Sequence, residues 1–457
     1  MRVWGDGLMS EAAQAAGNAN AITRAGGNFR WVICALLFFV ITINYIDRQV
    51  LGVLKPLIEE DLGWSEVDYG NIVSAFQFSY GIGLLVVGRL LDKVGTRWGM
   101  AIAIFLWSVA AMFHAAARSV LAFMLARITL GVAESAAYPG SVKSVAEWFP
   151  RRERALGVGI LNAGANVGVM MTPIVGLAVA FAYGWQGAFL VTGAIGFLVL
   201  IAWLLLYRQP REHPSLSAEE LAYIEQDGED PSAREVGWKD AIRHRQAWYF
   251  ICGKFFTDPV WYLFLFWLPD FFVTTQGLNL FPTGDNGILA TIGPALIGVY
   301  LLADIGSISG GWVSSHFIKI GWSVNRARKT TLFLAALCAV PLLFVLQIDN
   351  PLIVVLLIGL GTAGHQAFSS NIFTMISDLY PRKAVATIAG MGGLAGAIGG
   401  ILIAQATGWT LELTGSYVPI LIYAGLAYLI AFTAIHLLVP KMEPAPVSDS
   451  PPAETFE

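Results

Sequence analysis

Four basic side chains lie well inside strongly apolar stretches of the sequence: Arg48, Arg127, Lys143 and Lys254. Arg48 directly follows Asp47, and both come shortly after the run WVICALLFFVITI. A charged side chain at the centre of a bilayer costs about 2.5–3.5 kcal/mol even on lenient insertion scales. Charges in such places indicate function, and a guanidinium can bind a carboxylate through two parallel hydrogen bonds.

Arg48 is one of these four cations and could bind an anion. Tyr45 lies three residues earlier, so a helix puts the two on one face. Tyr80, in FQFSYGIG, is expected to add a hydroxyl from across the cavity. Two alternatives remain open: Arg48 could form an ion pair with an internal acid, and Tyr80 could be a packed aromatic ring.

Asp47 and Glu134 are the acids best placed to carry protons. A proton carrier must be able to exist in its neutral form, which burial favours, whereas a nearby cation favours the charged form. Arg127 precedes Glu134 by seven residues, or two helical turns, so these two share one helix face. Because adjacent helical residues point about 100° apart, Asp47 cannot share the face of Arg48. Alternatively, Arg127 and Glu134 only fasten helices together.

Amides and hydroxyls within the apolar stretches could bind the hydroxyl groups of a sugar. Asn162 and Asn166, in LNAGANVG, lie four residues apart on one helix face, where they could equally hold two helices together. The histidine of GHQAFSSNIFT could move protons or simply form a hydrogen bond. In the second half of the chain the predicted substrate-binding residues are Tyr262, His365, Gln366, Ser369, Ser370 and Asn371.

Two further acids of the second half have a structural interpretation. Lys254 and Asp258 stand one helical turn apart, so an ion pair between them is as reasonable as a role in substrate binding. Asp304, in LLADIGSISGG, is interpreted as an acid that stabilises the fold.

The apolar stretches are long enough to be membrane-spanning helices. Of the 457 residues, 56% are hydrophobic and only 13% charged, whereas soluble domains carry about 25% charged residues. About 20 apolar residues span a bilayer. Twelve such segments are predicted, at 30–54, 68–91, 97–117, 120–147, 154–182, 186–207, 247–273, 287–316, 330–347, 351–378, 384–409 and 416–439.

The distribution of Lys and Arg predicts the orientation of these helices. Basic residues gather in alternate loops, at 93–97, 151–154, 208–245, 319–329 and 382–383, whereas the opposite loops hold only Lys55 and Arg118. The positive-inside rule then places both termini and the long central loop in the cytoplasm, as an even number of helices requires.

The halves of the chain resemble each other. AEWFPRRERALGVGI ends the fourth predicted helix and begins the fifth, and SDLYPRKAVATIAGM does the same for the tenth and eleventh. Aligning Pro150 with Pro381 also matches Glu147 with Asp378, although both segments could be ordinary basic loops. Transporters built from two such repeats bind their substrate between the halves.

The sequence therefore predicts an all-α membrane protein with 12 transmembrane helices in two pseudo-symmetric six-helix bundles. The bundles are expected at 29–207 and 247–440, joined by a cytoplasmic linker at 208–246 whose segment SAEELAYIEQD forms a short surface helix. Residues 1–28 and 441–457 are expected to be cytoplasmic tails, the first of them disordered.

The loop after the second predicted helix, GRLLDKVGTRWG, has the features of a gate. A glycine at its start allows close helix packing and a second one a tight turn, while the aspartate can pair with a base or helix N-terminus of the other bundle. The loop resembles the G-x-L-x-D-[RK]-x-G-[RK]-[RK] signature of the major facilitator superfamily, with Thr96 as a departure. The predicted gating residues are Gly88, Asp92, Lys93, Gly95 and Arg97.

Further motifs extend this resemblance over residues 30–440. NYIDRQ, RITLGVAESAAYPG and EWFPRRERALGVGILNAGANVG look like the anion:cation symporter family of that superfamily, and GKFFTDPVWYLFLFWLPDF looks most like bacterial hexuronate transporters. The resemblance implies the major facilitator fold, and import of an organic anion coupled to proton entry across the bacterial inner membrane. It also implies that Asp47 and Glu134 carry protons, that Arg127 tunes them and that Arg48 binds substrate.

We therefore expect a monomeric symporter of a hexuronate or related sugar acid. An aromatic or dicarboxylic acid is the alternative substrate. An efflux antiporter for apolar cations is less consistent with Arg48, and a membrane receptor is the further alternative, which only a measured flux would exclude. No nucleophile, metal-ligand or nucleotide-binding pattern occurs, so an enzyme, a bound cofactor, ATP and nucleic acid are not expected.

Overall fold

The chain folds into long helices in its computed structural model, which describes residues 27–226, 242–282, 291–380 and 382–443. The expected terminal tails fall almost wholly outside these ranges. The α-helices are α2 (Phe29–Leu62), α3 (Glu66–Val94), α4 (Thr96–Phe113), α5 (Val120–Glu134), α6 (Ala137–Trp148), α7 (Arg151–Leu206), α8 (Ala218–Glu225), α10 (Arg245–Thr274), α11 (Ile292–Lys319), α12 (Val324–Leu337), α13 (Pro351–Leu379), α14 (Arg382–Thr414) and α15 (Val418–Leu438). Short 3-10 helices are η1 (His114–Ala116), η2 (Pro210–Glu212) and η5 (Val340–Gln347).

Twelve membrane crossings are found in the described part of the chain, as the sequence predicted. Ten helical segments there are long and apolar enough to cross a bilayer, counting α5 with α6 and α12 with η5 as one each. One of the ten, α7, holds two crossings because Gly184 has a φ of 72° and breaks the helix. The twelfth crossing is α10, a helix of 30 residues that contains charged side chains.

One predicted boundary is clearly wrong. The first helix was expected to end at residue 54, before the sequence Lys55–Pro56, but α2 continues to Leu62 with Pro56 inside it. A proline removes a single intrahelical hydrogen bond, which a well-packed membrane helix tolerates. Lys55 therefore lies inside the helix and is buried, rather than in a loop.

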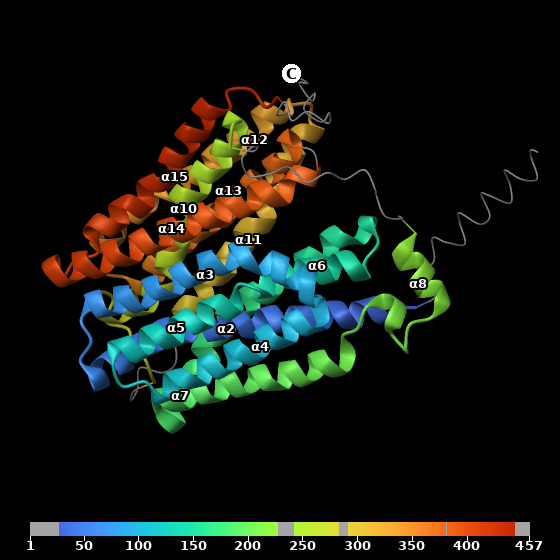
Figure 1. Cartoon of the computed structure of the whole chain (residues 1–457). Coiled ribbons are helices and arrows are strands. Elements are labelled where there is room, and N and C mark those ends of the chain that lie inside the picture. Colours follow the sequence, from blue (N-terminus) through green and yellow to red (C-terminus); the bar gives the residue numbers. More distant parts are fainter. Residues whose placement is uncertain (1–26, 227–241, 283–290, 381, 444–457) are drawn as a thin grey trace, which may run out of the picture.

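The two six-helix halves have equivalent packing. In the first half α2 packs on the first part of α7, α3 on α5 and α4 on the last part of α7; in the second half α10 packs on α14, α11 on α13 and α12 on α15. Figure 1 shows the first half, coloured blue to green, beside the second, coloured yellow to red. This correspondence confirms the pseudo-symmetric arrangement predicted from the repeat.

The two acids that the repeat matches, Glu147 and Asp378, make equivalent contacts. Glu147 accepts hydrogen bonds from the hydroxyls of Thr96, at the start of α4, and Tyr207. Asp378 pairs at 3.0 Å with Arg328, in the first turns of α12. Glu147 thus fixes α4 and Asp378 fixes α12, which are corresponding helices of the two halves. Thr96 has a partner in Glu147, although a threonine departs from the signature.

The linker is bound to the first half through α8, the short helix expected there. The Glu220 carboxylate accepts hydrogen bonds from the backbone N–H groups of Phe29 and Arg30 and pairs with the Arg30 guanidinium at 3.1 Å. An acid in this place suits the positive end of the α2 dipole. His213, whose ring lies 4.3 Å from that of Phe29, has its pKa lowered by burial.

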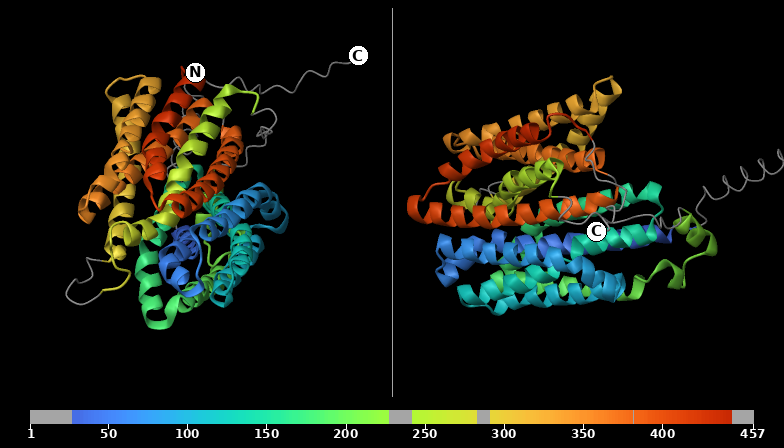
Figure 2. Two further views of the ribbon diagram at one scale, coloured as in Figure 1. Left: turned by 90° about the vertical axis from the view of Figure 1, so that its left-hand side faces the viewer. Right: turned by 45° about the horizontal axis from the view of Figure 1, so that its top comes forward.

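The halves meet along three helix pairs: α2 with α10, α3 with α14 and α7 with α11. Figure 2 shows the two halves from two further directions. α3 and α14 approach closely because Gly70 faces the Ala404 carbonyl and Gly408 faces that of Glu66. We call the end of the molecule near α8 the linker end, and the end where α2 finishes and α3 begins the gate end (Figure 1).

Candidate functional site

Arg48 is buried in the middle of α2 among aromatic rings. Its guanidinium carbon lies 4.8 Å from the ring centroid of Tyr45, 4.6 Å from that of Tyr80 and 5.3 Å from that of Phe76. Each such contact favours a cation by about 0.5–2 kcal/mol. The sequence paired Arg48 with Tyr45 and Tyr80, and the structure brings these three together.

Glu134 is the acid that Arg48 contacts. The Arg48 Nε donates to the Glu134 Oε2 at 3.0 Å, and the pair is almost fully buried. The other oxygen of Glu134, Oε1, is buried and accepts no hydrogen bond from the described residues. α5 ends at Glu134 and α6 begins at Ala137, so the acid sits where the fourth crossing is interrupted. An ion pair of this kind leaves one carboxylate oxygen ready for a proton.

Arg127 holds the backbone beneath this pair. Its Nη1 donates to the Arg48 carbonyl oxygen at 3.1 Å, and its guanidinium lies 5.6 Å from the Phe76 ring centroid. The shared face expected for Arg127 and Glu134 is present in α5, but Arg127 contacts the backbone of Arg48. It positions the residue that holds Glu134.

Asp47 points away from Arg48, as adjacent helical positions must. Its carboxylate is buried, and neither oxygen accepts a hydrogen bond by distance and angle from the described residues. Thr192, in the last part of α7, and Glu134 are its near neighbours.

Tyr262 reaches the surroundings of Arg48 from the second half through ring contacts: it stacks on Phe266, whose ring lies 6.3 Å from that of Phe76. Lys254 and Asp258 pair at 2.6 Å one turn apart on the same helix. His365 has its own partners: its Nδ1 lies 2.9 Å from the Tyr428 hydroxyl, and its ring stacks on Trp261 at 5.1 Å. The hydrogen-bonding interpretation of His365 therefore has direct geometric support.

The remaining predicted polar residues lie in several environments. Asn162 is exposed beside Tyr138, and Asn166 lies beside Asp304 of the other half. Gln366 and Ser369 are half-buried. Asn371 and Ser370 bond within the second half, to backbone carbonyls of α11 and of α13 itself.

The predicted gate loop lies at the linker end, and among the described residues its hydrogen bonds and its ion pair all stay within the first half. Asp92 pairs with Lys143 of its own half. Its contact with the other half stays a prediction for a state in which this end is closed. Gly95 has a φ of 82°, which makes the expected turn, whereas the space beside Gly88 is open. Lys93 is exposed, and Arg97 donates to the Leu204 carbonyl.

A cluster that the sequence did not predict joins the halves at the gate end. Lys55 Nζ lies 2.7 Å from Asp270, 2.8 Å from Glu66 and 3.1 Å from Glu59, and the Tyr417 hydroxyl donates to Asp270. These five residues form the gate cluster. Among the described residues, its three acids have the spacing of metal ligands, but the ammonium of Lys55 already lies among them. Lys55 was assigned to a loop, and its place next to Pro56 hid the signal.

Other contacts between the halves lie close to this cluster. Tyr69 donates to the Phe266 carbonyl, the Gln405 amide donates to Asn71 and Ser74, and the Gln49 amide donates to the Tyr300 hydroxyl at 3.2 Å. The two halves are thus joined from the gate end to the level of Arg48.

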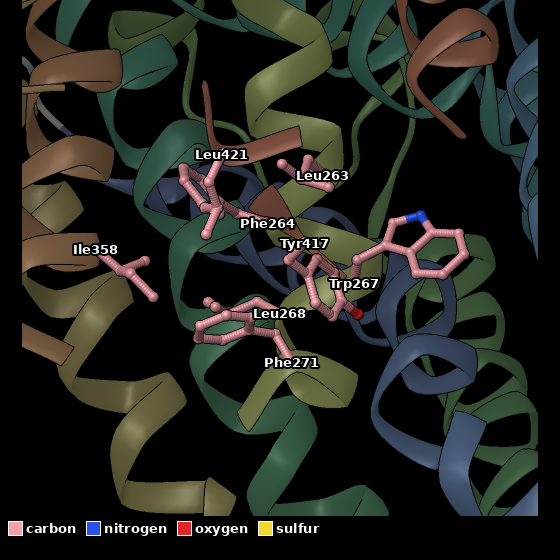
Figure 3. A pocket seen from close by; sticks show the side chains of 8 residues that line it. All are labelled: Leu263, Phe264, Trp267, Leu268, Phe271, Ile358, Tyr417 and Leu421. Carbon is pink, nitrogen blue, oxygen red and sulfur yellow. The ribbon is translucent and has the colours of Figure 1, made fainter. Parts of the chain in front are cut away.

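A small apolar pocket lies within the second half, close to the gate cluster (Figure 3). Its lining has no charged group, so it lacks the means to bind an anion. The lining side chains are Leu263, Phe264, Trp267, Leu268, Phe271, Ile358, Tyr417 and Leu421.

These features, twelve crossings in two equivalent halves with a buried cation between aromatic rings, define a membrane transporter rather than an enzyme. Residues 37–404 match the family profile of the Major Facilitator Superfamily, and the chain belongs to that superfamily. Solved structures agree: a bacterial homolog to the human lysosomal transporter Spinster, in an inward-facing and occupied conformation, has a TM-score of 0.69 at 17% identity. The match covers 91% of this chain and 98% of that one, and it supports the fold alone.

Curated relatives are transporters of sugar acids. The chain is 30% identical to the hexuronate transporter of Escherichia coli K12 over 384 residues, which cover 83% of this chain and 87% of the relative. It is 29% identical to the D-galactonate transporter of Escherichia coli O6:H1, covering 90% and 96%. It is also 29% identical to a protein of Bacillus subtilis named as a probable galactarate/D-glucarate transporter, covering 92% and 94%.

Proposed function

We propose that this protein imports a sugar acid with one carboxylate, a hexuronate or a close relative, together with protons across a bacterial inner membrane. The relatives named above supply the substrate class, and Arg48 supplies the group that would bind the carboxylate. The transporter works as a monomer with both termini, and hence the linker end, in the cytoplasm.

The Arg48–Glu134 ion pair carries the proposal. Arg48 cannot hold the substrate carboxylate and an ionised Glu134 equally well, because both acids compete for the same donors. A proton on Glu134 neutralises this competitor and frees the guanidinium for the substrate. When the substrate leaves, Glu134 regains its contact with Arg48 and releases the proton. The 3.0 Å contact between the Arg48 Nε and the Glu134 Oε2 thereby couples binding of the anion to binding of the proton.

Alternating access supplies the transport step. Contacts between the halves run from the gate cluster to the Gln49–Tyr300 hydrogen bond, which supports a state closed to the outside and facing inward. Rocking of one half against the other would break them and form contacts at the linker end, where Asp92 is exposed.

The hydroxyl groups of the sugar need donors and acceptors on both sides of Arg48. Tyr262 reaches the surroundings of Arg48 from the second half, and the half-buried Gln366 and Ser369 are available on α13. Asn162 offers an exposed amide from the first half. We assign these residues to the sugar, and we assign the proton to Glu134 and then Asp47, with Arg127 positioning Arg48.

The test is uptake into liposomes that contain the purified protein. An inward proton gradient should drive accumulation of labelled galacturonate or glucuronate, and a protonophore should abolish it. Glu134→Gln should lose gradient-driven accumulation but keep some exchange, whereas Arg48→Ala should lose binding itself. Uptake that ignores the protonophore, or full exchange by Arg48→Ala, would refute the mechanism.

The rings around Arg48 leave one alternative substrate. Tyr45, Phe76 and Tyr80 would also pack against an aromatic acid. Labelled benzoate in the same liposomes distinguishes the two, since a sugar-acid transporter should not accumulate it.

A further inference from the structure

Asp304 is an acid within a membrane crossing that has no basic partner. It forms no ion pair with the described residues, and its Oδ1 is buried without a hydrogen bond. The side chain as a whole is only half-buried. Its neighbour Asn166, a neutral amide of the first half, can bond to the carboxylate but does not balance its charge. No cation among the described residues pairs with Asp304, so its charge needs another explanation.

The contacts of α11 show which way Asp304 faces. Tyr300, four residues earlier, accepts a hydrogen bond from Gln49 of the first half, so this face of α11 looks across to α2. Asp304 lies one turn, about 6 Å, further toward the linker end. Asn166 of α7 lies beside it, again from the first half. Leu301 and Ile305 are exposed and both lie on the side of Asp304 away from Tyr300, so Asp304 stands between the contact with the first half and the exposed side of α11.

Asp304 is therefore level with the candidate anion site. Tyr45 precedes Gln49 on α2 by four residues, which carries it the same single turn toward the linker end. Tyr45 is one of the rings around the Arg48 guanidinium, at 4.8 Å. At this level a substrate held by Arg48 would have Tyr45 of the first half on one side and α11, which carries Asp304, across from it in the second half.

The cations of the first and seventh crossings already have acid partners. Arg48 contacts Glu134, and Lys254 pairs with Asp258 at 2.6 Å. One substrate carboxylate can replace Glu134 at Arg48 after proton uptake. A second carboxylate on the same substrate would approach the side of the site that holds Asp304, where like charges repel.

We propose that Asp304 makes the site selective for sugar acids with one carboxylate, by accepting hydrogen bonds from hydroxyls and repelling a second carboxylate. The inference rests on the proposed function, because it assumes that a sugar acid binds at Arg48. It distinguishes this chain's expected substrates, such as galacturonate, from aldarates such as galactarate.

The wild-type protein gives the first test, by competition for uptake of labelled galacturonate in liposomes. Unlabelled galactarate should compete at least about tenfold less well than unlabelled galacturonate, whereas the monomethyl ester of galactarate should compete well. The ester keeps the length and hydroxyls of galactarate but only one charge. Equal competition by galactarate, or equal rejection of the ester, overturns the proposal.

Substitution of the acid gives the second test. Asp304→Asn removes the charge at nearly constant size and should raise the ratio of galactarate to galacturonate uptake about tenfold. Asp304→Glu keeps the charge and serves as the matched control, with the ratio unchanged. An unchanged ratio in Asp304→Asn refutes the role of Asp304; if that variant is inactive with both acids, the wild-type competition by the ester decides.

The proposed function and the selectivity role of Asp304 can fail separately. If the wild-type protein accumulates no sugar acid, the proposed function falls. If it accumulates galacturonate but Asp304→Asn and the ester show no effect of charge, only the selectivity role falls.

Discussion

Replacing Lys55 by methionine should open the gate end. Lys55 is the only cation in the gate cluster, where it contacts two acids of the first half and Asp270 of the second. Lys55→Met keeps the length of the side chain but leaves the buried Asp270 facing the half-buried Glu59 and Glu66 with no cation between them. Separation of the halves would let water reach those acids, so the cost of the substitution falls mainly on the closed state.

The size of the expected shift toward an open gate end follows from the burial of the Lys55–Asp270 ion pair. Removing one partner of a buried ion pair costs about 3–5 kcal/mol. Each 1.4 kcal/mol changes an equilibrium constant about tenfold. Even the lower figure, applied to the closed state alone, would shift the ratio of closed to open gate about a hundredfold.

The assay is labelling of single cysteines by a membrane-impermeant thiol reagent, after replacement of Cys34, Cys252 and Cys338. Ser74→Cys reports on the gate end, because Ser74 is buried against Gln405 when the halves are joined. Gly311→Cys reports on the linker end, where the space beside Gly311 is open.

Lys55→Met should increase labelling of the gate-end reporter and decrease that of the linker-end reporter. The control is Glu225→Gln, which removes an exposed ion pair within the linker worth about 0–1 kcal/mol and should change neither. Unchanged labelling in Lys55→Met, or a shift in the opposite direction, would refute the assignment of the gate cluster as the contact that closes this end.

Three further outcomes are expected. Arg48→Lys should weaken galacturonate binding by at least about tenfold in a scintillation proximity assay, because an ammonium lacks the planar fork of donors; wild-type affinity would contradict bidentate binding. Glu147→Gln should lower the thermal unfolding midpoint in detergent, because a neutral amide replaces the carboxylate that accepts the hydrogen bond of the Tyr207 hydroxyl. An unchanged midpoint would mean that this hydrogen bond does not stabilise the fold. Gly184→Ala should also lower that midpoint, because a φ of 72° with a ψ of 173° is adopted readily only by glycine and costs another residue about 1–3 kcal/mol of stability. A more stable variant would argue against the break between the fifth and sixth crossings.

The sequence by itself determined the class of fold. Long apolar runs have no stable place outside a bilayer, and their number, with the repeated segments around Pro150 and Pro381, fixed two bundles of six. Helical spacing also determined which neighbours share a face, so Tyr45 could be placed with Arg48, and Asp47 could be placed apart from it. Local periodicity was sufficient for these predictions because each of them concerns a single helix.

Partners on different helices were decided only by the tertiary structure. The sequence left open whether Glu134 contacts Arg127 or an arginine of another helix, and the packing of α5 on its neighbours placed it at Arg48. Lys55 and Asp270 are 215 positions apart, and no spacing rule connects residues at that distance. The partner of Asp92 was predicted in the other half and found in its own, because a gate contact depends on the state of the whole molecule.

Asp304 shows the same limit most clearly. Its sequence context, LLADIGSISGG, suggests only an acid in an apolar helix, for which a structural partner is the ordinary expectation. The Gln49–Tyr300 hydrogen bond is what orients α11 and turns Asp304 toward the other half. The types of residue were therefore set by the sequence, whereas the charge that each one faces was set by how the helices pack within each bundle and between the two.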